Sequence, residues 1–134
     1  MDKYQKFYDQ LPEIEVPAPY TRVTRLLFDS ADDSDLPFGA ALYRLKAGQR
    51  GTAHNHENEI EIYVILGGCG TITFGGQTRE LSSRSLVWVQ PRTVHETRNT
   101  GAGDLMILGI FVPPIDFSEV QDNWKKLAEG SDTR

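Results

Sequence analysis

From residue 38 onward the chain alternates short β-prone runs with turn-forming residues, and this pattern limits the folds open to it. The runs are rich in Val, Ile, Leu, Tyr and Thr, residues that suit strands. Eight strands are predicted, over residues 40–45, 53–56, 60–66, 71–74, 78–81, 86–90, 94–97 and 105–112. Gly75-Gly76, between two of them, has the length of a two-residue hairpin turn. Many short strands with close turns predict an all-β sandwich or barrel.

Two of the predicted strands are apolar on both faces. Residues 63–66 read YVIL and residues 106–111 read MILGIF, whereas a strand with one face in water alternates apolar and polar residues. Both faces must therefore be covered. We expect a homodimer, because these strands and the proline-rich N-terminal arm offer apolar surface that one small barrel does not cover.

The predicted barrel occupies residues 38–114 and has a different kind of segment on each side. Residues 1–37 are expected to form an arm, with a short helical turn or loop, an extended proline-rich stretch and a possible first strand over 21–28. Residues 115–134 are expected to hold a short helix over 118–129 and a tail. Ser118 and Gln121 have the spacing of a capping box. Val120, Trp124 and Leu127 form a stripe that we expect to pack on the barrel exterior.

Length and charge narrow the classes of partner. A chain of 134 residues has the size of one domain. Its 14 Lys and Arg residues against 19 Asp and Glu residues give a net charge of −5, and the basic residues are scattered, so nucleic acid is not an expected partner. No apolar run is long enough for a transmembrane helix. The single cysteine, Cys69, and the absence of a secretory signal at the start favour a cytoplasmic location, with Cys69 as a small filler residue.

The chain has three histidines, and their spacing suggests a shared site. His54 and His56 are one residue apart, so on a strand both rings leave from the same face. Glu61 follows five residues later at the head of a strand, and His95 begins another strand. Such a histidine pair alone is more often surface or core than a ligand pair.

The stretch from Gly48 to Gly68 resembles the first motif of the cupin family. It reads Gly48, five residues, His54, one residue, His56, four residues, Glu61, six residues and Gly68. The second motif of that family reads Gly, five residues, Pro, one residue, Gly, two residues, His, three residues, Asn. Here only His95 and Asn99 are in place, and its turn positions hold Arg84, Gln90 and Arg92. These departures affect the shape of the turns before His95 more than they affect the assignment of His95 as a ligand.

The resemblance implies a double-stranded β-helix, a jelly-roll barrel, that holds one divalent metal ion at its open end. The ligands would be His54, His56, Glu61 and His95. Three imidazoles and one carboxylate suit Fe, Mn, Ni, Co or Zn, and four ligands leave an octahedral ion with open positions for a substrate. The other possibility is a cupin that keeps these residues but works without metal.

Strand alternation suggests further contacts inside the barrel. If Glu61 points inward, so does Tyr63, which is a candidate catalytic residue or a packed core aromatic. If His95 points inward, so does Thr97, a candidate substrate contact. Arg92, in the loop before His95, could meet an anionic substrate or could be an ordinary surface arginine.

These observations predict a metal-dependent enzyme acting on a small organic substrate. By resemblance it would be a dioxygenase, or an isomerase, lyase or decarboxylase. Two alternatives remain open at this point, a non-catalytic module that binds a metabolite or sugar, and a metal-independent sugar-nucleotide isomerase or epimerase. One scaffold carries many chemistries, so the fold cannot choose among them.

Overall fold

The computed structural model describes residues 2–51, 54 and 56–129 of the chain. These residues form nine strands, one α-helix and a short 3-10 helix. In chain order the elements are η1 (Tyr8–Gln10), β1 (Ile14–Val16), β2 (Arg22–Phe28), β3 (Gly39–Leu45), β4 (Ile60–Gly67), β5 (Cys69–Phe74), β6 (Gln77–Ser82), β7 (Leu86–Val89), β8 (His95–Asn99), β9 (Leu105–Val112) and α1 (Phe117–Ala128).

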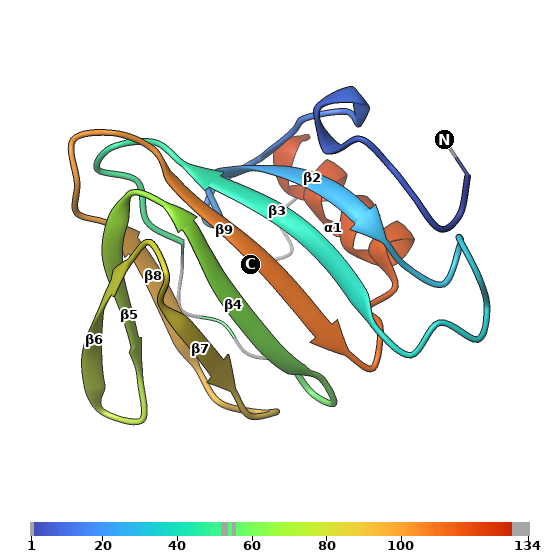
Figure 1. Cartoon of the computed structure of the whole chain (residues 1–134). Coiled ribbons are helices and arrows are strands. Elements are labelled where there is room, and N and C mark those ends of the chain that lie inside the picture. Colours follow the sequence, from blue (N-terminus) through green and yellow to red (C-terminus); the bar gives the residue numbers. More distant parts are fainter. Residues whose placement is uncertain (1, 52–53, 55, 130–134) are drawn as a thin grey trace.

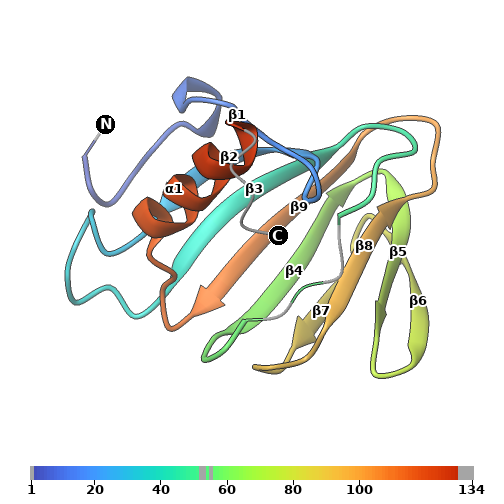
Figure 2. The same ribbon diagram turned by 180° about the vertical axis from the view of Figure 1, so that it is seen from behind.

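The strands form two antiparallel sheets. A six-stranded sheet has the order β1-β2-β3-β9-β4-β7, and a three-stranded sheet has the order β6-β5-β8 (Figure 1). Seen from behind, α1 lies across β2 and β3 (Figure 2). The order is not sequential because β9 inserts between β3 and β4, so the last strand completes the centre of the large sheet.

The inner face of the large sheet carries the core. In β9 the residues Leu105, Ile107 and Phe111 are buried, and in β4 Tyr63 and Ile65 are buried. The alternate residues of both strands, such as Val64 and Leu108, are only partly covered by the chain. The doubly apolar strands are thus fully buried on one face alone, and Trp88 of the neighbouring β7 is 57% exposed.

Most predicted strands agree closely with the structure. The predicted strand over 21–28 corresponds to β2, and seven of the eight later ones correspond to β3 through β9, with bounds that differ by at most two residues. The remaining one, over 53–56, includes residues outside those described. Gly75 and Gly76 form the predicted hairpin turn with φ of +60° and +73°. The strand β1 was not predicted, because Ile14–Val16 lies between prolines.

The helix differs from its prediction at its cap and in what it covers. Its N-cap is Asp116, whose carboxylate accepts hydrogen bonds from the backbone N–H groups of Ser118 and Glu119. The capping box with Ser118 is therefore wrong. Val120 and Trp124 line an internal cavity instead of packing on the barrel exterior.

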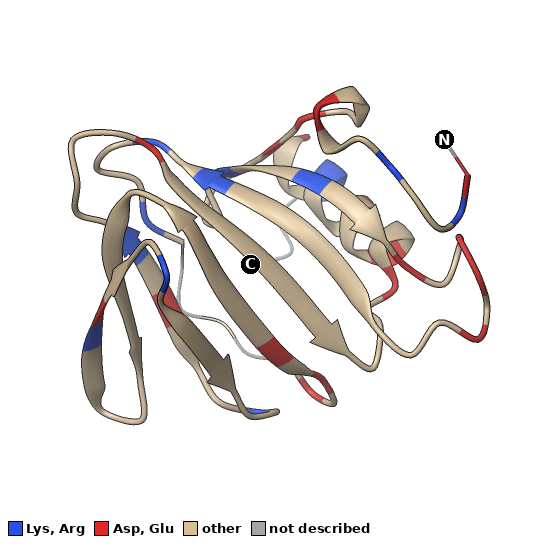
Figure 3. Ribbon diagram, in the orientation of Figure 1, with Lys and Arg blue, Asp and Glu red and all other residues tan. Residues whose placement is uncertain are grey.

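Charged residues are spread over many elements. Figure 3 shows acidic residues gathered in the loop between β2 and β3, and no long basic stretch on the described ribbon. In the part of the chain that the structure describes, no helix is long and apolar enough to cross a membrane. The cytoplasmic location stays a prediction.

Candidate metal centre

The starts of β4 and β8 and two histidines of the segment before β4 bring four ligand side chains together. Glu61 is the second residue of β4 and is 1% exposed, and His95 is the first residue of β8 and is also 1% exposed. The backbone of His54 pairs with that of His95 through N–H to carbonyl bonds of 3.0 and 2.8 Å. The carbonyl of His56 accepts a bond of 2.6 Å from the backbone N–H of Arg92. These backbone bonds hold both histidines of the first motif beside β8.

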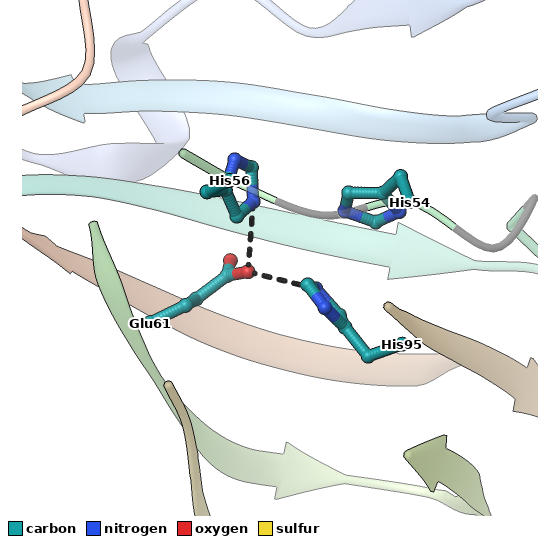
Figure 4. Close-up of side chains that lie close together, drawn as sticks. All are labelled: His54, His56, Glu61 and His95. Atoms are coloured by element: carbon teal, nitrogen blue, oxygen red, sulfur yellow. Dashed lines mark hydrogen bonds and ion pairs between the residues drawn. The ribbon is translucent and has the colours of Figure 1, made fainter. Parts of the chain in front are cut away.

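The four side chains converge on one point (Figure 4). One ligand atom from each of the residues His54, His56, Glu61 and His95 lies within 4.8 Å of the others. Nε2 of His56 lies 3.2 Å from Oε1 of Glu61, and Nε2 of His95 lies 3.3 Å from the same oxygen. The predicted ligand set is thus assembled from residues up to 41 positions apart in sequence.

The hydrogen bond at Nδ1 of His95 determines whether Nε2 can act as a metal ligand. Nδ1 of His95 donates to the carbonyl of Thr93 at 2.9 Å, because a carbonyl oxygen can only accept. In the neutral ring, Nε2 then presents a lone pair to the carboxylate of Glu61. Two acceptors at 3.3 Å repel each other unless a cation lies between them, either a proton or a metal ion. This pair of atoms is therefore suited to holding a cation.

The donor set and its spacing fit a divalent transition metal. Ligands on one ion at about 2.1 Å are about 3–4.2 Å apart, so the group, within 4.8 Å, is close to the spacing that one ion requires. Three imidazoles and one carboxylate suit such ions. His54, His56, Glu61 and His95 are the residues that would hold it.

The pKa of Glu61 favours the ionised form that a metal requires. Burial alone would raise this pKa, but hydrogen bonds and charges from His56 and His95 lower it to about 2. The carboxylate is ionised at neutral pH as a result.

Two buried tyrosines orient Glu61 from the other side. The hydroxyl of Tyr63 donates to Oε1 at 2.8 Å, and that of Tyr43 donates to Oε2 at 3.4 Å. Burial, and then the charge of Glu61, raise the pKa of both phenols well above its ordinary value. Both hydroxyls therefore keep their protons and act as donors. Tyr43 was not predicted, because its run AALYRL is apolar around most of its length and does not show which residues face inward.

Gly109 of β9 makes room for this arrangement. A Cβ at Gly109 would lie 2.7 Å from Cε2 of Tyr43 and 3.2 Å from Oε2 of Glu61. The glycine that interrupts the apolar run MILGIF is the sequence signal for this close approach.

The centre opens into a cavity of about 80 Å³ enclosed by the large sheet, β8 and α1. Tyr63 and Thr97 line it, as their strand positions predicted. Arg92 is exposed and does not line it; its guanidinium lies 3.5 Å from the carbonyl of Glu57. Sequence reasoning missed several other lining residues, namely Arg22, Thr24, Leu26, Tyr43, Phe111 and Phe117.

Comparison with known proteins agrees with this architecture. The cupin domain family matches residues 41–111, which is more than half of the chain. The chain belongs to the cupin family, and its fold is the double-stranded β-helix. An uncharacterized protein of Methanocaldococcus jannaschii is 30% identical over 74 residues, 55% of this chain and 59% of that protein. An uncharacterized protein of Streptomyces coelicolor is 32% identical over 73 residues, 54% of this chain and 68% of that protein.

Three solved structures share the fold at low sequence identity. Ectoine synthase from P. lautus has a TM-score of 0.73 and 21% identity, covering 89% of this chain and 84% of that chain. KdgF from Halomonas sp. has a TM-score of 0.72 and 20% identity, covering 84% and 96%. A predicted oxalate decarboxylase from Thermotoga maritima has a TM-score of 0.71 and 22% identity, covering 80% and 96%.

Proposed function

We propose that this protein is a metal-dependent cupin enzyme that acts on a small organic substrate. The observation that carries the proposal is the convergence of His54, His56, Glu61 and His95 at a cavity that also receives a protonated tyrosine. A structural site closes its ligand shell with protein groups, whereas a catalytic site leaves positions open. Four protein ligands leave positions open on an octahedral ion, and the proposal is for such an ion beside this cavity.

Each group of this chain has a distinct task in the proposed reaction. A divalent ion bound by the four ligands would supply Lewis acidity toward an oxygen-bearing substrate or would bind dioxygen. Tyr43 and Tyr63 hold Glu61 in place by hydrogen bonds, and Tyr63 keeps its proton and faces the cavity. The single O–H of Tyr63 is engaged by Glu61, so toward a bound molecule its oxygen can act as a hydrogen-bond acceptor. The apolar side chains of α1 limit the access of water.

Cavity size separates this proposal from one of its alternatives. A cavity of about 80 Å³ suits a small organic molecule, and this favours such a substrate over a sugar nucleotide. Two proteins that share the fold are named as enzymes, ectoine synthase and a predicted oxalate decarboxylase, and this supports an enzymatic role. Experiment must decide whether the reaction is that of a dioxygenase or that of an isomerase, lyase or decarboxylase.

Metal loading of a chelator-treated protein tests the proposal. The protein would be loaded separately with Fe(II), Mn, Ni, Co and Zn, and then mixed with diketones, catechols, hydroxy acids and keto acids with and without dioxygen. We expect turnover with at least one metal and one substrate class. Oxygen uptake would assign a dioxygenase, and turnover without oxygen would assign an isomerase, lyase or decarboxylase.

A pair of glutamate variants provides the control. Glu61→Gln should lower the bound metal well below one ion per chain and abolish turnover. Glu96→Gln, on β8 and near Arg50 at the surface, should leave both unchanged. If no metal supports turnover while the parent protein binds a metabolite tightly, the protein is a binding module and not an enzyme.

A further inference from the structure

We propose that Arg22 and Thr24 hold the carboxylate of a small organic acid inside the cavity, beside the metal centre. The inference rests on the proposed function, because it assigns the substrate class of the same site. It concerns two residues of β2 that take no part in binding the metal.

Arg22 and Thr24 both face the cavity from β2. They are two residues apart, so strand alternation points their side chains to the same face, and both line the cavity together with Leu26. Thr24 is 0% exposed. Oγ1 of Thr24 and Nε of Arg22 are buried and have no hydrogen-bond partner. A buried polar atom without a partner costs about 1–3 kcal/mol, so two of them side by side indicate that a ligand completes their bonding.

The guanidinium of Arg22 is held in position by an aromatic ring. Its central carbon lies 4.6 Å from the centroid of the Tyr43 ring, in the geometry of a cation-π contact. The hydroxyl of the same tyrosine donates to Glu61. Tyr43 therefore connects the arginine with the metal centre, and a molecule held by Arg22 lies beside the ligands.

Thr97 of β8 adds a hydroxyl to the same corner. A Cβ at Gly51 would lie 3.8 Å from Oγ1 of Thr97 and 3.9 Å from Nη1 of Arg22. Both groups thus border one point next to Gly51. A carboxylate there can accept hydrogen bonds from the guanidinium and from hydroxyl groups.

The charges of the cavity favour a single negative charge on the ligand. Among the described residues, no ion pair joins Arg22 to an acidic side chain, and the carboxylate of Glu61 is engaged by two histidines and two tyrosines. The buried Nε of Arg22 has no partner, and the planar fork of an arginine matches a carboxylate. Arg22 is the sole Lys or Arg among the described lining residues. One guanidinium near the charge of Glu61 suits a carboxylate better than a phosphate dianion.

Pyruvate is a suitable probe because its six non-hydrogen atoms match the cavity, and 2-oxopropanamide is its neutral counterpart of equal size. Binding would be measured by calorimetry on metal-free and Zn-loaded protein, and the Nε–H signal of Arg22 would be followed by ¹⁵N NMR. We expect pyruvate to bind and to shift that signal in both forms. The amide should bind at least about tenfold more weakly, as expected for loss of a charged hydrogen bond.

Three variants and one control test the residues. Arg22→Gln should raise the dissociation constant of pyruvate at least about tenfold, and Thr24→Val, which keeps the shape of the side chain, about threefold or more. Arg22→Lys keeps the charge without the planar fork and should lie between the parent and Arg22→Gln. Arg98→Gln, an exposed arginine next to Thr97 on β8, should bind pyruvate as the parent does. If Arg22→Gln fails to fold, Thr24→Val and Arg22→Lys decide.

The possible results separate the inference from the proposed function. Unchanged pyruvate affinity in the variants, equal affinity for the amide, or no saturable binding by about 10 mM overturns the inference. Tighter, Arg22-dependent binding of inorganic phosphate overturns the choice of a carboxylate. If pyruvate binds through Arg22 but no metal supports turnover, the inference stands and the enzymatic proposal fails. If a metal supports turnover of neutral substrates alone, the enzymatic proposal stands and the inference about Arg22 and Thr24 fails.

Discussion

Gly109→Ala tests whether the metal centre depends on the close packing of Tyr43 against β9. The new Cβ would lie 2.7 Å from Cε2 of Tyr43, about 1 Å inside the ordinary carbon-carbon contact of ~3.7 Å. The Tyr43 ring must therefore move away from β9. The bond from its hydroxyl to Glu61 is already 3.4 Å long, so a shift of that size breaks it.

The expected cost combines three contributions. Overpacking costs about 1–3 kcal/mol, and the lost hydrogen bond about 1 kcal/mol. Reduced entropy of the unfolded chain returns about 0.4–1 kcal/mol. We expect the free energy of unfolding of the metal-free protein to fall by about 1–3.6 kcal/mol in urea titrations, and Zn affinity to fall about tenfold.

A matched glycine and a double-mutant cycle make the test specific. Gly67→Ala in β4 adds a Cβ with nothing within 4 Å and should be neutral or stabilise slightly. In a Tyr43→Leu background, which lacks the obstructing ring, Gly109→Ala should cost at least about 1 kcal/mol less than in the parent. If Gly109→Ala behaves as Gly67→Ala does in both stability and Zn affinity, the reasoning about Tyr43 is wrong.

Three further predictions concern the ligands and the outer face of the sheet. Tyr63→Phe removes the 2.8 Å bond to Glu61 and should weaken Zn binding about tenfold in competition with a chelating dye, whereas Tyr8→Phe at the surface should not. Acid should release the metal by protonating its imidazole ligands, because Glu61, with a pKa of about 2, stays ionised in mild acid; a metal content that is unchanged at pH 4 would contradict this. The homodimer stays a proposal. Trp88 pairs with Ile62 on the outer face of the large sheet and is 57% exposed, so light scattering should show that Trp88→Glu converts a dimer to a monomer. A parent protein that is already monomeric at tens of micromolar would refute the homodimer.

The sequence predicted the strands and the ligands well because both depend on short-range patterns. Turn residues such as Gly75 and Gly76 adopt the positive φ that their type favours. The four ligands lie at the motif positions and meet in space. Local spacing was enough for the strands, whereas the ligand set also required the resemblance to the cupin motifs.

The substrate-facing residues could not be predicted in the same way because they depend on strand pairing. Thr24 pairs with Tyr43, which pairs with Ile107, and these registers bring the polar side chains of β2 into the cavity. The sequence around Arg22 does not show that β9 inserts between β3 and β4. The position of α1 was likewise not predicted, since an apolar stripe such as Val120 and Trp124 can cover either face of a sheet.

The altered second motif shows how the ligand His95 survives the loss of the motif's glycines. Arg84 and Arg92 occupy the two glycine positions, and both adopt positive φ, +82° and +59°. The backbone thus keeps the conformation that glycine would allow, at a cost of about 1 kcal/mol or more for each arginine. The backbone N–H of Arg92 donates to the carbonyl of His56. The strained turn therefore connects the segment that holds His56 with β8, which begins at His95. Because this contact uses the main chain, the glycine could be replaced without moving the metal ligands, provided that the turn kept its shape.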